Sequence, residues 1–387
     1  MDYNLFLSDK VKKIKPSGIR KFFDIVTEMK DAVSLGVGEP DFVTPWHIRL
    51  NGIRSLEQGS THYTSNWGLL ELRKAISDYM SRRFELDYDY TSQILVTVGG
   101  SEGIDQCIRA LVNPGDEVLI PEPSFVCYSP MTVLAGGTPV AIKTYAKDKF
   151  KLTPEALKAA ITPKTKLLIL PYPNNPTGGI MTKDDLEKIA AILRDSNVFV
   201  LSDEIYAELT YTDQRHVSIA SLPGMYERTV IINGFSKAYA MTGWRLGFAT
   251  GPKEVLAAMT KIHQYAIMSA PTTSQFAAIE AMENGDDDIE RMKDEYNCRR
   301  RLVVESFRRI GLDCFEPEGA FYVFPSIHKT GYTSEDFCEK LLYSKKVAVV
   351  PGNAFGDSGE GFFRASYCYS VENLQKAISL IDEFVNK

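Results

Sequence analysis

The chain has 387 residues with 44% hydrophobic and 24% charged side chains, the composition of a globular protein with a sizeable core and two domains. Its formal net charge of −6 argues against nucleic acid as a partner. The N-terminus lacks a basic start followed by an apolar stretch, and no apolar run approaches the roughly 20 residues that cross a bilayer, so we expect a cytoplasmic protein without a membrane span.

Residues up to about 45 form an irregular arm with a short helical candidate over 19–29, followed by the glycine-rich stretch Gly36-Val37-Gly38. Residues 46–285 alternate apolar strands with helical patterns, such as the amphipathic pattern over 183–194. Strands are predicted over residues 94–98, 117–120, 139–142, 166–170, 199–202, 230–233 and 246–250. This alternation predicts an α/β fold whose large domain has a mostly parallel seven-stranded sheet covered on both faces. The last strand follows too closely for a crossover helix and is expected to pair antiparallel.

A second, smaller α+β unit is predicted from residue 286 to the end of the chain. It begins with a long charged helix over 286–310 and continues with helices over 334–342 and 371–384. Short strands are predicted over 321–324, 347–350 and 361–365. The six cysteines and five histidines are dispersed without the spacing of metal ligands, so we expect reduced thiols and no metal.

Three consecutive strands of the large domain are each followed by, or end in, a polar side chain that is a candidate catalytic or binding group. Asn175 follows the apolar run 167–170, Asp203 ends the next strand, and Lys237 follows the strand after that. Ligands of open α/β sheets bind at the carboxyl ends of the strands, so one site could hold all three groups. A lysine at the end of a buried strand is partly desolvated, which lowers its pKa and makes its amine nucleophilic.

A pyridine-based cofactor needs these groups. An aspartate beside the ring nitrogen keeps it protonated, an amide and a phenol such as Tyr206 can bind the ring oxygen, and a lysine can form a Schiff base. Each group also has an ordinary interpretation: Asn175 as a turn residue, Asp203 as a helix N-cap and Lys237 as a surface lysine. Their joint occurrence in this order argues against those interpretations.

The chain resembles the class I aminotransferases of the fold type I pyridoxal 5′-phosphate superfamily, in the branch of aspartate and aromatic aminotransferases. The specific motifs are Asn174-Asn175-Pro176-Thr177-Gly178 and the segment from Ser236-Lys237 to Gly243-Trp244-Arg245. The resemblance extends from Leu35 to Tyr367. It implies a large cofactor domain over 46–285 and a small domain over 286–387, with residues 1–45 as the N-terminal arm and part of that small domain.

The resemblance also assigns roles to further residues. The turn Gly100-Ser101-Glu102, the last through its backbone, would cradle the cofactor phosphate together with Ser236 and Arg245, which suits a helix N-terminus and a guanidinium. Phe125 would stack on the pyridine ring, although it could equally be a core phenylalanine. Tyr63 would reach a phosphate across the interface of a homodimer with shared active sites. Arg364 would bind the substrate carboxylate, with backbone from Gly38.

The expected reaction is a ping-pong transamination between an L-amino acid and a 2-oxo acid such as 2-oxoglutarate. Lys237, Asp203 and Tyr206 are the expected catalytic residues, and Asn175 touches both cofactor and substrate. In one dicarboxylate-specific branch a lysine stands where this chain has Ser101, which favours an aromatic or broad-range substrate over aspartate. Candidate pocket-lining aromatic residues are Phe22, Phe23, Trp67, Phe321 and Tyr322.

Two other functions are alternatives to transamination for a chain of this fold. Carbon–sulfur β-lyases share the fold and most of these residues, and remain the alternative. A ligand-sensing regulator would carry an additional basic DNA-binding domain, whereas only about 30 residues precede the glycine-rich turn of this acidic chain, so we do not expect that function.

Overall fold

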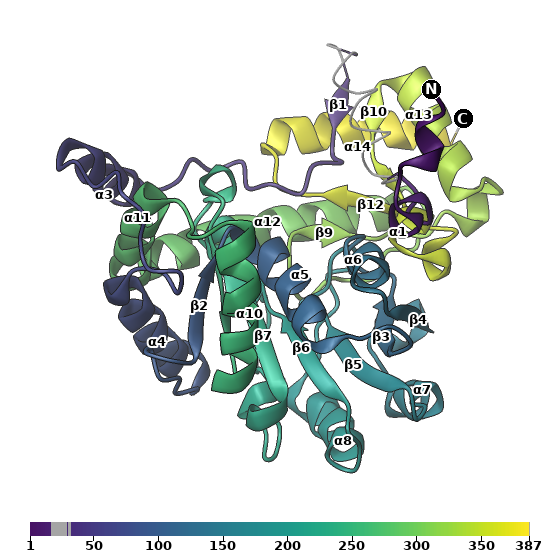
Figure 1. The fold of residues 1–387 in the computed structure, drawn as a ribbon. Helices are drawn as coiled ribbons and strands as arrows, with labels where there is room; N and C mark the ends of the chain where they lie inside the picture. The colour runs from purple at the N-terminus through teal and green to yellow at the C-terminus, as the bar shows by residue number, and fades with distance from the viewer. Residues whose placement is uncertain (17–28, 30–31, 387) are drawn as a thin grey trace.

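A seven-stranded sheet forms the centre of the computed structural model, which describes residues 1–16, 29 and 32–386 (Figure 1). Its strands are β2 (Ile94–Thr97), β3 (Glu117–Glu122), β4 (Thr138–Lys143), β5 (Thr165–Leu170), β6 (Phe199–Asp203), β7 (Thr229–Gly234) and β8 (Gly247–Thr250). Their order is β2-β8-β7-β6-β5-β3-β4, and every pair is parallel except those that β8 makes with β2 and β7. The predicted fold class, the seven strands and the antiparallel last strand are confirmed.

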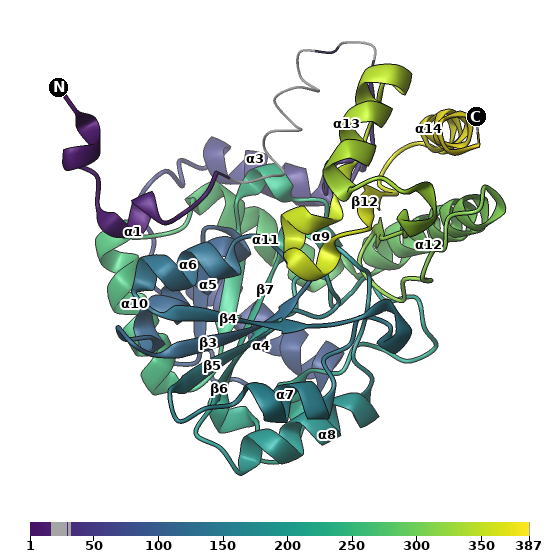
Figure 2. The same cartoon turned by 90° about the vertical axis from the view of Figure 1, so that its right-hand side faces the viewer.

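Helices cover both faces of this sheet because its side chains alternate between two buried clusters. On β6, Leu201 packs with one cluster and Val200 with the opposite one. The first face carries α5 (Gly99–Leu111), α6 (Tyr128–Ala135) and α10 (Lys253–Ala266). The second carries α4 (Leu70–Phe84), α7 (Pro154–Ala160), α8 (Lys183–Arg194) and α11 (Thr272–Asn284), with α3 (Trp46–Glu57) packed on α11. Figure 2 shows α5, α6 and α10 on the side of the sheet opposite α7 and α8.

The remaining elements form a smaller α+β unit with its own core. It contains α12 (Asp286–Arg309), α13 (Ser334–Lys345) and α14 (Val371–Val385), as predicted. The strand predicted over 347–350 is wrong as a single element. It divides into β10 (Val347–Ala348), which pairs with β1 (Val33–Ser34), and β11 (Val350–Pro351), which joins β12 (Phe363–Ser366) and β9 (Tyr322–Val323). The division between Ala348 and Val350 lets one extended segment serve two sheets.

The described helices and strands leave two predictions untested: the N-terminal helix and the domain bounds. Residues 19–28 of the predicted N-terminal helix, together with Phe22 and Phe23, lie outside the described part of the chain. The domain bounds at residues 45 and 285 stay a prediction, although the pairing of β1 with β10 places the beginning of the chain beside its last third. Among the described residues, α1 (Asp9–Lys12) and α9 (Phe235–Ala238) are further short α-helices.

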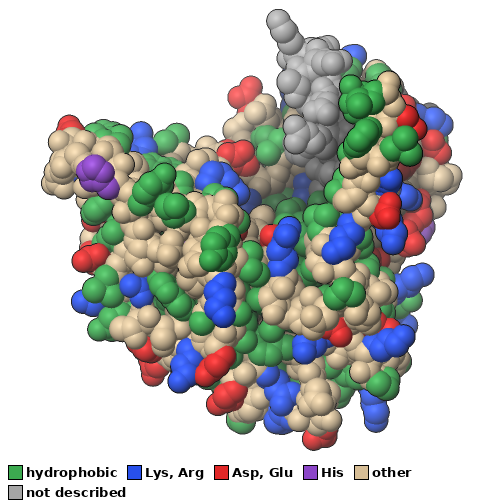
Figure 3. Space-filling model, in the orientation of Figure 1, with side chains coloured by type: hydrophobic (Ala, Val, Ile, Leu, Met, Phe, Trp, Pro, Cys, Tyr) green, Lys and Arg blue, Asp and Glu red, His purple; other side chains and the backbone are tan. Residues whose placement is uncertain are grey.

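Charged side chains of both signs are mixed on the surface of the protein. On the face shown in Figure 3, lysine and arginine side chains are interspersed with aspartate and glutamate. In the part of the chain that the structure describes, no helix has the length and apolar character needed to span a bilayer. At the carboxyl edge of the sheet, β5, β6 and β7 end below β9 and β12 (Figure 1).

Candidate active site

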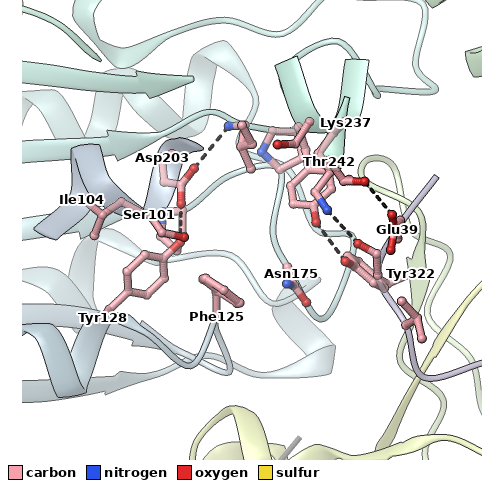
Figure 4. A pocket seen from close by; sticks show the side chains of 18 of the residues that line it. Glu39, Ser101, Ile104, Phe125, Tyr128, Asn175, Asp203, Lys237, Thr242 and Tyr322 are labelled. Carbon is pink, nitrogen blue, oxygen red and sulfur yellow. Dashed lines mark hydrogen bonds between the residues drawn. The ribbon is translucent and has the colours of Figure 1, made fainter. Parts of the chain in front are cut away.

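A cavity of about 370 Å³ lies at this carboxyl edge, between the large sheet and the smaller unit. Most of the residues singled out in the sequence line it: Gly38, Gly100, Ser101, Phe125, Asn175, Asp203, Tyr206, Ser236, Lys237, Arg245 and Arg364. Figure 4 shows how the side chains from different elements point toward one another. Parallel strands bring their carboxyl ends to one edge, which is why residues far apart in the sequence meet here.

Lys237 lies in the single turn α9, directly after β7. Its Nζ donates a hydrogen bond to the carbonyl oxygen of Gly38 at 2.7 Å and lies 5.7 Å from the centre of the Tyr206 ring. Burial lowers the pKa of the lysine to about 8. About one tenth of the amine is therefore in the neutral, nucleophilic form at pH 7, far more than for an ordinary lysine, and most of it is neutral above about pH 8.

Asp203 ends β6 and is buried. One carboxylate oxygen accepts a hydrogen bond from the Tyr128 hydroxyl at 2.7 Å, and the other accepts from the backbone N–H of Ile205 at 3.2 Å. Burial raises the pKa of Asp203 to about 6, although the bond from Tyr128 acts in the opposite direction. Tyr128 was not singled out from the sequence, where its only signal is its place three residues after Phe125.

Arg364 on β12 lines the cavity in direct contact with Asn175. One guanidinium nitrogen donates to Asn175 Oδ1 at 2.9 Å, and another donates to the carbonyl oxygen of Gly36. The remaining nitrogen, Nε, is buried and has no hydrogen-bond partner among the described residues. The guanidinium carbon lies 4.4 Å from the centre of the Tyr322 ring. A desolvated cation with a free donor is well suited to bind a carboxylate.

Tyr322 closes the cavity between the two units. Its hydroxyl is 2.8 Å from the hydroxyl of Tyr206, and a Cβ atom at Gly38 would lie only 1.9 Å from the Tyr322 hydroxyl. Gly38 is therefore the residue that leaves room for this tyrosine. Of the other suggested aromatic residues, the structure describes Phe321 and Trp67. Neither lines the cavity, because Phe321 packs in the core of the smaller unit and Trp67 packs at the edge of a core cluster under α5 and α10.

One corner of the cavity, at the N-terminus of α5, has groups that suit an anion. Gly100 and Ser101 in the first turn of this helix line the cavity, and a Cβ atom at Gly99 would lie 2.8 Å from Arg245 Nη2. Arg245 adopts φ 53° and donates from Nη1 to the carbonyl oxygen of Thr242 at 3.2 Å. Free backbone N–H groups of a helix start and a guanidinium thus face one corner of the cavity, the usual arrangement for binding phosphate.

Two predicted site residues are not among those that line the cavity. The carboxylate of Glu102 accepts a hydrogen bond from the backbone N–H of Val98 instead of pointing into it. Tyr63 is 81% exposed. A single chain therefore does not bring Tyr63 to the corner of the cavity at the N-terminus of α5.

These observations allow a test of whether pyridoxal 5′-phosphate fits the residues present. The corner at Gly100 and Arg245 suits its phosphate, and the buried Asp203 carboxylate suits its ring nitrogen. The partly neutral amine of Lys237 suits its aldehyde. The donor set fits the cofactor, with Arg364 left for a substrate carboxylate.

The chain is similar along nearly its whole length to proteins of known class. The family model for aminotransferase class I and II matches residues 30–381. The putative aminotransferase YugH of Bacillus subtilis is 56% identical over 382 residues, which cover 99% of each chain. The aspartate aminotransferase of Pyrococcus abyssi is 44% identical over 98% of each chain. A solved aromatic aminotransferase of Pyrococcus horikoshii superposes with a TM-score of 0.91 at 43% identity, over 95% of this chain and 98% of the other.

Proposed function

The chain belongs to the aminotransferase class I and II family, and we propose that it transfers the amino group of an aromatic or a broad range of L-amino acids to a 2-oxo acid such as 2-oxoglutarate. It is a pyridoxal 5′-phosphate-dependent aminotransferase of fold type I. The observation that carries the residue assignments is the meeting of the Lys237 amine, the buried Asp203 carboxylate and the free donor of Arg364 in one cavity. The roles below are proposals that rest on this geometry.

When bound, the cofactor supplies an aldehyde for the substrate amine and a ring that withdraws electrons from the substrate α-carbon. Lys237 Nζ would remove the proton from that carbon and return it, since its lowered pKa lets it act as a base. Asp203 would hold a proton on the ring nitrogen, and the position of its carboxylate is fixed by Tyr128. Asn175 and Tyr206 would bind the ring oxygen.

The remaining residues would hold the two molecules in place. Gly100, Ser101, Ser236 and Arg245, with the backbone of Glu102, would bind the phosphate, and Phe125 would cover one face of the ring. Arg364 would bind the substrate carboxylate beside Gly38. The bonds to Asn175 and to the carbonyl oxygen of Gly36 orient the guanidinium before substrate arrives, and Nε stays available for this carboxylate.

The charges that line the cavity support the substrate class. Among its described lining residues, the lysine and arginine side chains are Lys237, Arg245 and Arg364, each of which already has a proposed partner. No further cation from the described part of this chain faces a second substrate carboxylate, and Glu39 adds a negative charge to the lining. An uncharged side chain is therefore the better fit for the preferred amino-acid donor, whereas glutamate and 2-oxoglutarate would bind without a described lining cation for their second carboxylate.

We propose further that the active form is a homodimer. Large apolar side chains are exposed on α3, at the end of α10 and in the loops that follow these two helices: Trp46, Ile53, Leu56, Tyr63, Tyr265, Ile267 and Met268. The loops are held together by a hydrogen bond from Asn66 to the carbonyl oxygen of Met268 and one from Thr272 to that of His62, both 2.7 Å long. A second copy of the chain would cover this surface and bring Tyr63 to the phosphate of its neighbour. The cytoplasmic location stays a prediction.

The β-lyase alternative finds no support, since the relatives compared above are aminotransferases. A spectral titration tests the substrate class directly. The cofactor-loaded protein is mixed with single amino acids in the absence of any oxo acid, and the cofactor absorbance is followed. We expect phenylalanine, tyrosine and glutamate to convert the cofactor to its aminated form, and 2-oxoglutarate to restore it. Aspartate reacting much faster than the aromatic amino acids would refute the substrate class, and release of pyruvate and ammonia from a cysteine conjugate without conversion would favour the lyase.

A further inference from the structure

A buried polar cluster ties the anion-binding turn to helix α10. Glu102 stands in the fourth position of α5, and its Oε2 accepts a hydrogen bond from the backbone N–H of Val98 at 2.5 Å. Its Oε1 accepts from Gln106 Nε2 at 2.6 Å and lies 2.9 Å from Nδ1 of His263 on α10. The His263 side chain is fully buried, and its Nδ1 also lies 3.2 Å from Gln106 Nε2. The shorter contact, to the carboxylate oxygen, assigns the proton to Nδ1.

The charge of Glu102 is unexpected at this place. A carboxylate near a helix N-terminus is favourable while the helix start is free. Once a phosphate dianion binds the same helix start, the carboxylate repels it. By charge alone, therefore, Glu102 weakens the site that its neighbours Gly100 and Ser101 form, and its presence needs a different physical reason.

The N-terminus of α5 explains why a glutamate is present at position 102. Val98 is the N-cap of α5, and no side chain caps the free N–H groups of the first turn. A serine or aspartate at this position would occupy one of those N–H groups and compete with an anion. Glu102, at N4 and thus one residue beyond the N3 position of a capping box, instead accepts from the backbone N–H of Val98 and leaves the first turn open.

We propose that Glu102 and His263 are positioning residues for the cofactor phosphate: they fix the turn from Val98 to Ser101 by anchoring it to α10, while the first-turn N–H groups stay available to the anion. This inference rests on the proposed cofactor site. The hydrogen bonds of the Glu102 carboxylate then favour phosphate binding more than its negative charge opposes it.

Two effects of opposite sign make the proposal testable. Glu102→Ala removes both the hydrogen bonds and the charge, and we expect the dissociation constant of pyridoxal 5′-phosphate to rise about tenfold or more. Glu102→Gln removes the charge but keeps an oxygen that can accept from Val98, and its amide N–H₂ can donate to Nδ1 of His263 once that imidazole carries its proton on Nε2. Because both links are kept, its dissociation constant should stay within about threefold of the unmodified protein or fall. The constants are measured by absorbance titration of the apoprotein, which requires no turnover.

His263 provides a second pair of variants if Glu102→Ala does not fold. His263→Ala should weaken cofactor binding, and His263→Gln should restore much of it, because an amide N–H can replace the imidazole donor. Asp105→Ala is the matched control, since it removes a carboxylate from the same helix that is paired only with Arg109, at 2.8 Å. We expect this control to bind the cofactor as tightly as the unmodified protein or more tightly.

Equal or tighter binding by Glu102→Ala, as for the control, would overturn the proposal, because the carboxylate would then act through its charge alone. Unchanged binding by His263→Ala would overturn the part played by α10. Both results require that the unmodified protein binds the cofactor. If the unmodified protein does not bind it, the proposed function fails before this inference is tested.

Discussion

Lys237 and Asp203 lie in one cavity, and burial moves their pKa values in opposite directions, to about 8 for the amine and about 6 for the carboxyl. Desolvation favours the neutral form of each group. Most of the Lys237 amine is therefore neutral, and nucleophilic, above about pH 8, and most of the Asp203 carboxyl is ionised above about pH 6. Both groups are therefore mostly in the state that the chemistry needs only from about pH 8 upward.

This pH range gives a first prediction for Lys237. The rate at which the apoprotein captures pyridoxal 5′-phosphate should rise with pH and level off above about 8, because only the neutral amine attacks the aldehyde. Stopped-flow absorbance over a series of buffers measures this rate. A rise that continues toward 10.5, the ordinary lysine value, would show that the reacting amine is exposed to solvent.

A second prediction concerns Tyr128. Tyr128→Phe removes the hydroxyl that donates to Asp203, so the pKa of Asp203 should rise and the acid limb of the pH profile should move to higher pH. We expect kcat/KM near pH 6 to fall by about tenfold, with a smaller loss at about pH 8. Tyr172→Phe is the control, because it also removes a buried hydroxyl, one that donates to the carbonyl oxygen of Phe150 at 2.8 Å. Equal profiles for the two variants would refute the role of Tyr128.

Single residues were predictable from the sequence where a strand ends in them. Asn175, Asp203 and Lys237 each follow an apolar run, and the rule for open α/β sheets brings such positions together. Tyr128 and His263 were not predictable in this way, because each contacts a residue far away in the sequence and sits in a pattern that ordinary helices also show.

At the scale of elements, β8 passes close to the start of α5. A Cβ atom at Gly247 would lie 2.7 Å from the backbone nitrogen of Gly100 and 2.8 Å from the carbonyl carbon of Gly99. Backbone atoms cannot move aside as the end of a side chain can. The first turn of α5 therefore keeps its place against the sheet only while residue 247 has no side chain.

Replacing this glycine gives a third prediction. Gly247→Ala should lower the free energy of unfolding by about 1–3 kcal/mol and weaken cofactor binding, because the phosphate turn must shift. Gly243→Ala is the control in the same segment, since a Cβ atom there meets nothing within 4 Å. Thermal unfolding with and without pyridoxal 5′-phosphate measures both effects. Equal behaviour of the two variants would contradict the close approach.

Most elements were predictable because their patterns are strong. The antiparallel pairing of β8 was expected from the short connection before it, and α12 and α14 begin at the predicted residues. The segment 347–350 was predicted as one strand because its apolar run is continuous, but β10 and β11 pair in different sheets. Periodicity indicates extended backbone and does not identify the partner of a strand.

At the scale of the whole molecule, the exposed position of Tyr63 connects assembly to catalysis. A dimer with shared sites makes a fourth prediction through hybrid dimers of Lys237→Ala and Tyr63→Ala subunits. Each homodimer should be impaired at both sites, whereas a hybrid contains one site with Lys237 from one subunit and Tyr63 from the other. We expect the purified hybrid to regain about half of the unmodified activity per dimer. A hybrid no more active than the mean of the two homodimers would show that Tyr63 serves its own chain or none.

The most direct test of the whole account is to locate the cofactor on the chain. The protein loaded with pyridoxal 5′-phosphate is reduced with borohydride, which makes the bond between cofactor and lysine permanent, and its peptides are analysed by mass spectrometry. We predict that the added mass lies on Lys237 and that the Lys237→Ala variant carries none. Modification of a different lysine, or no modification of the unmodified protein, would contradict the account.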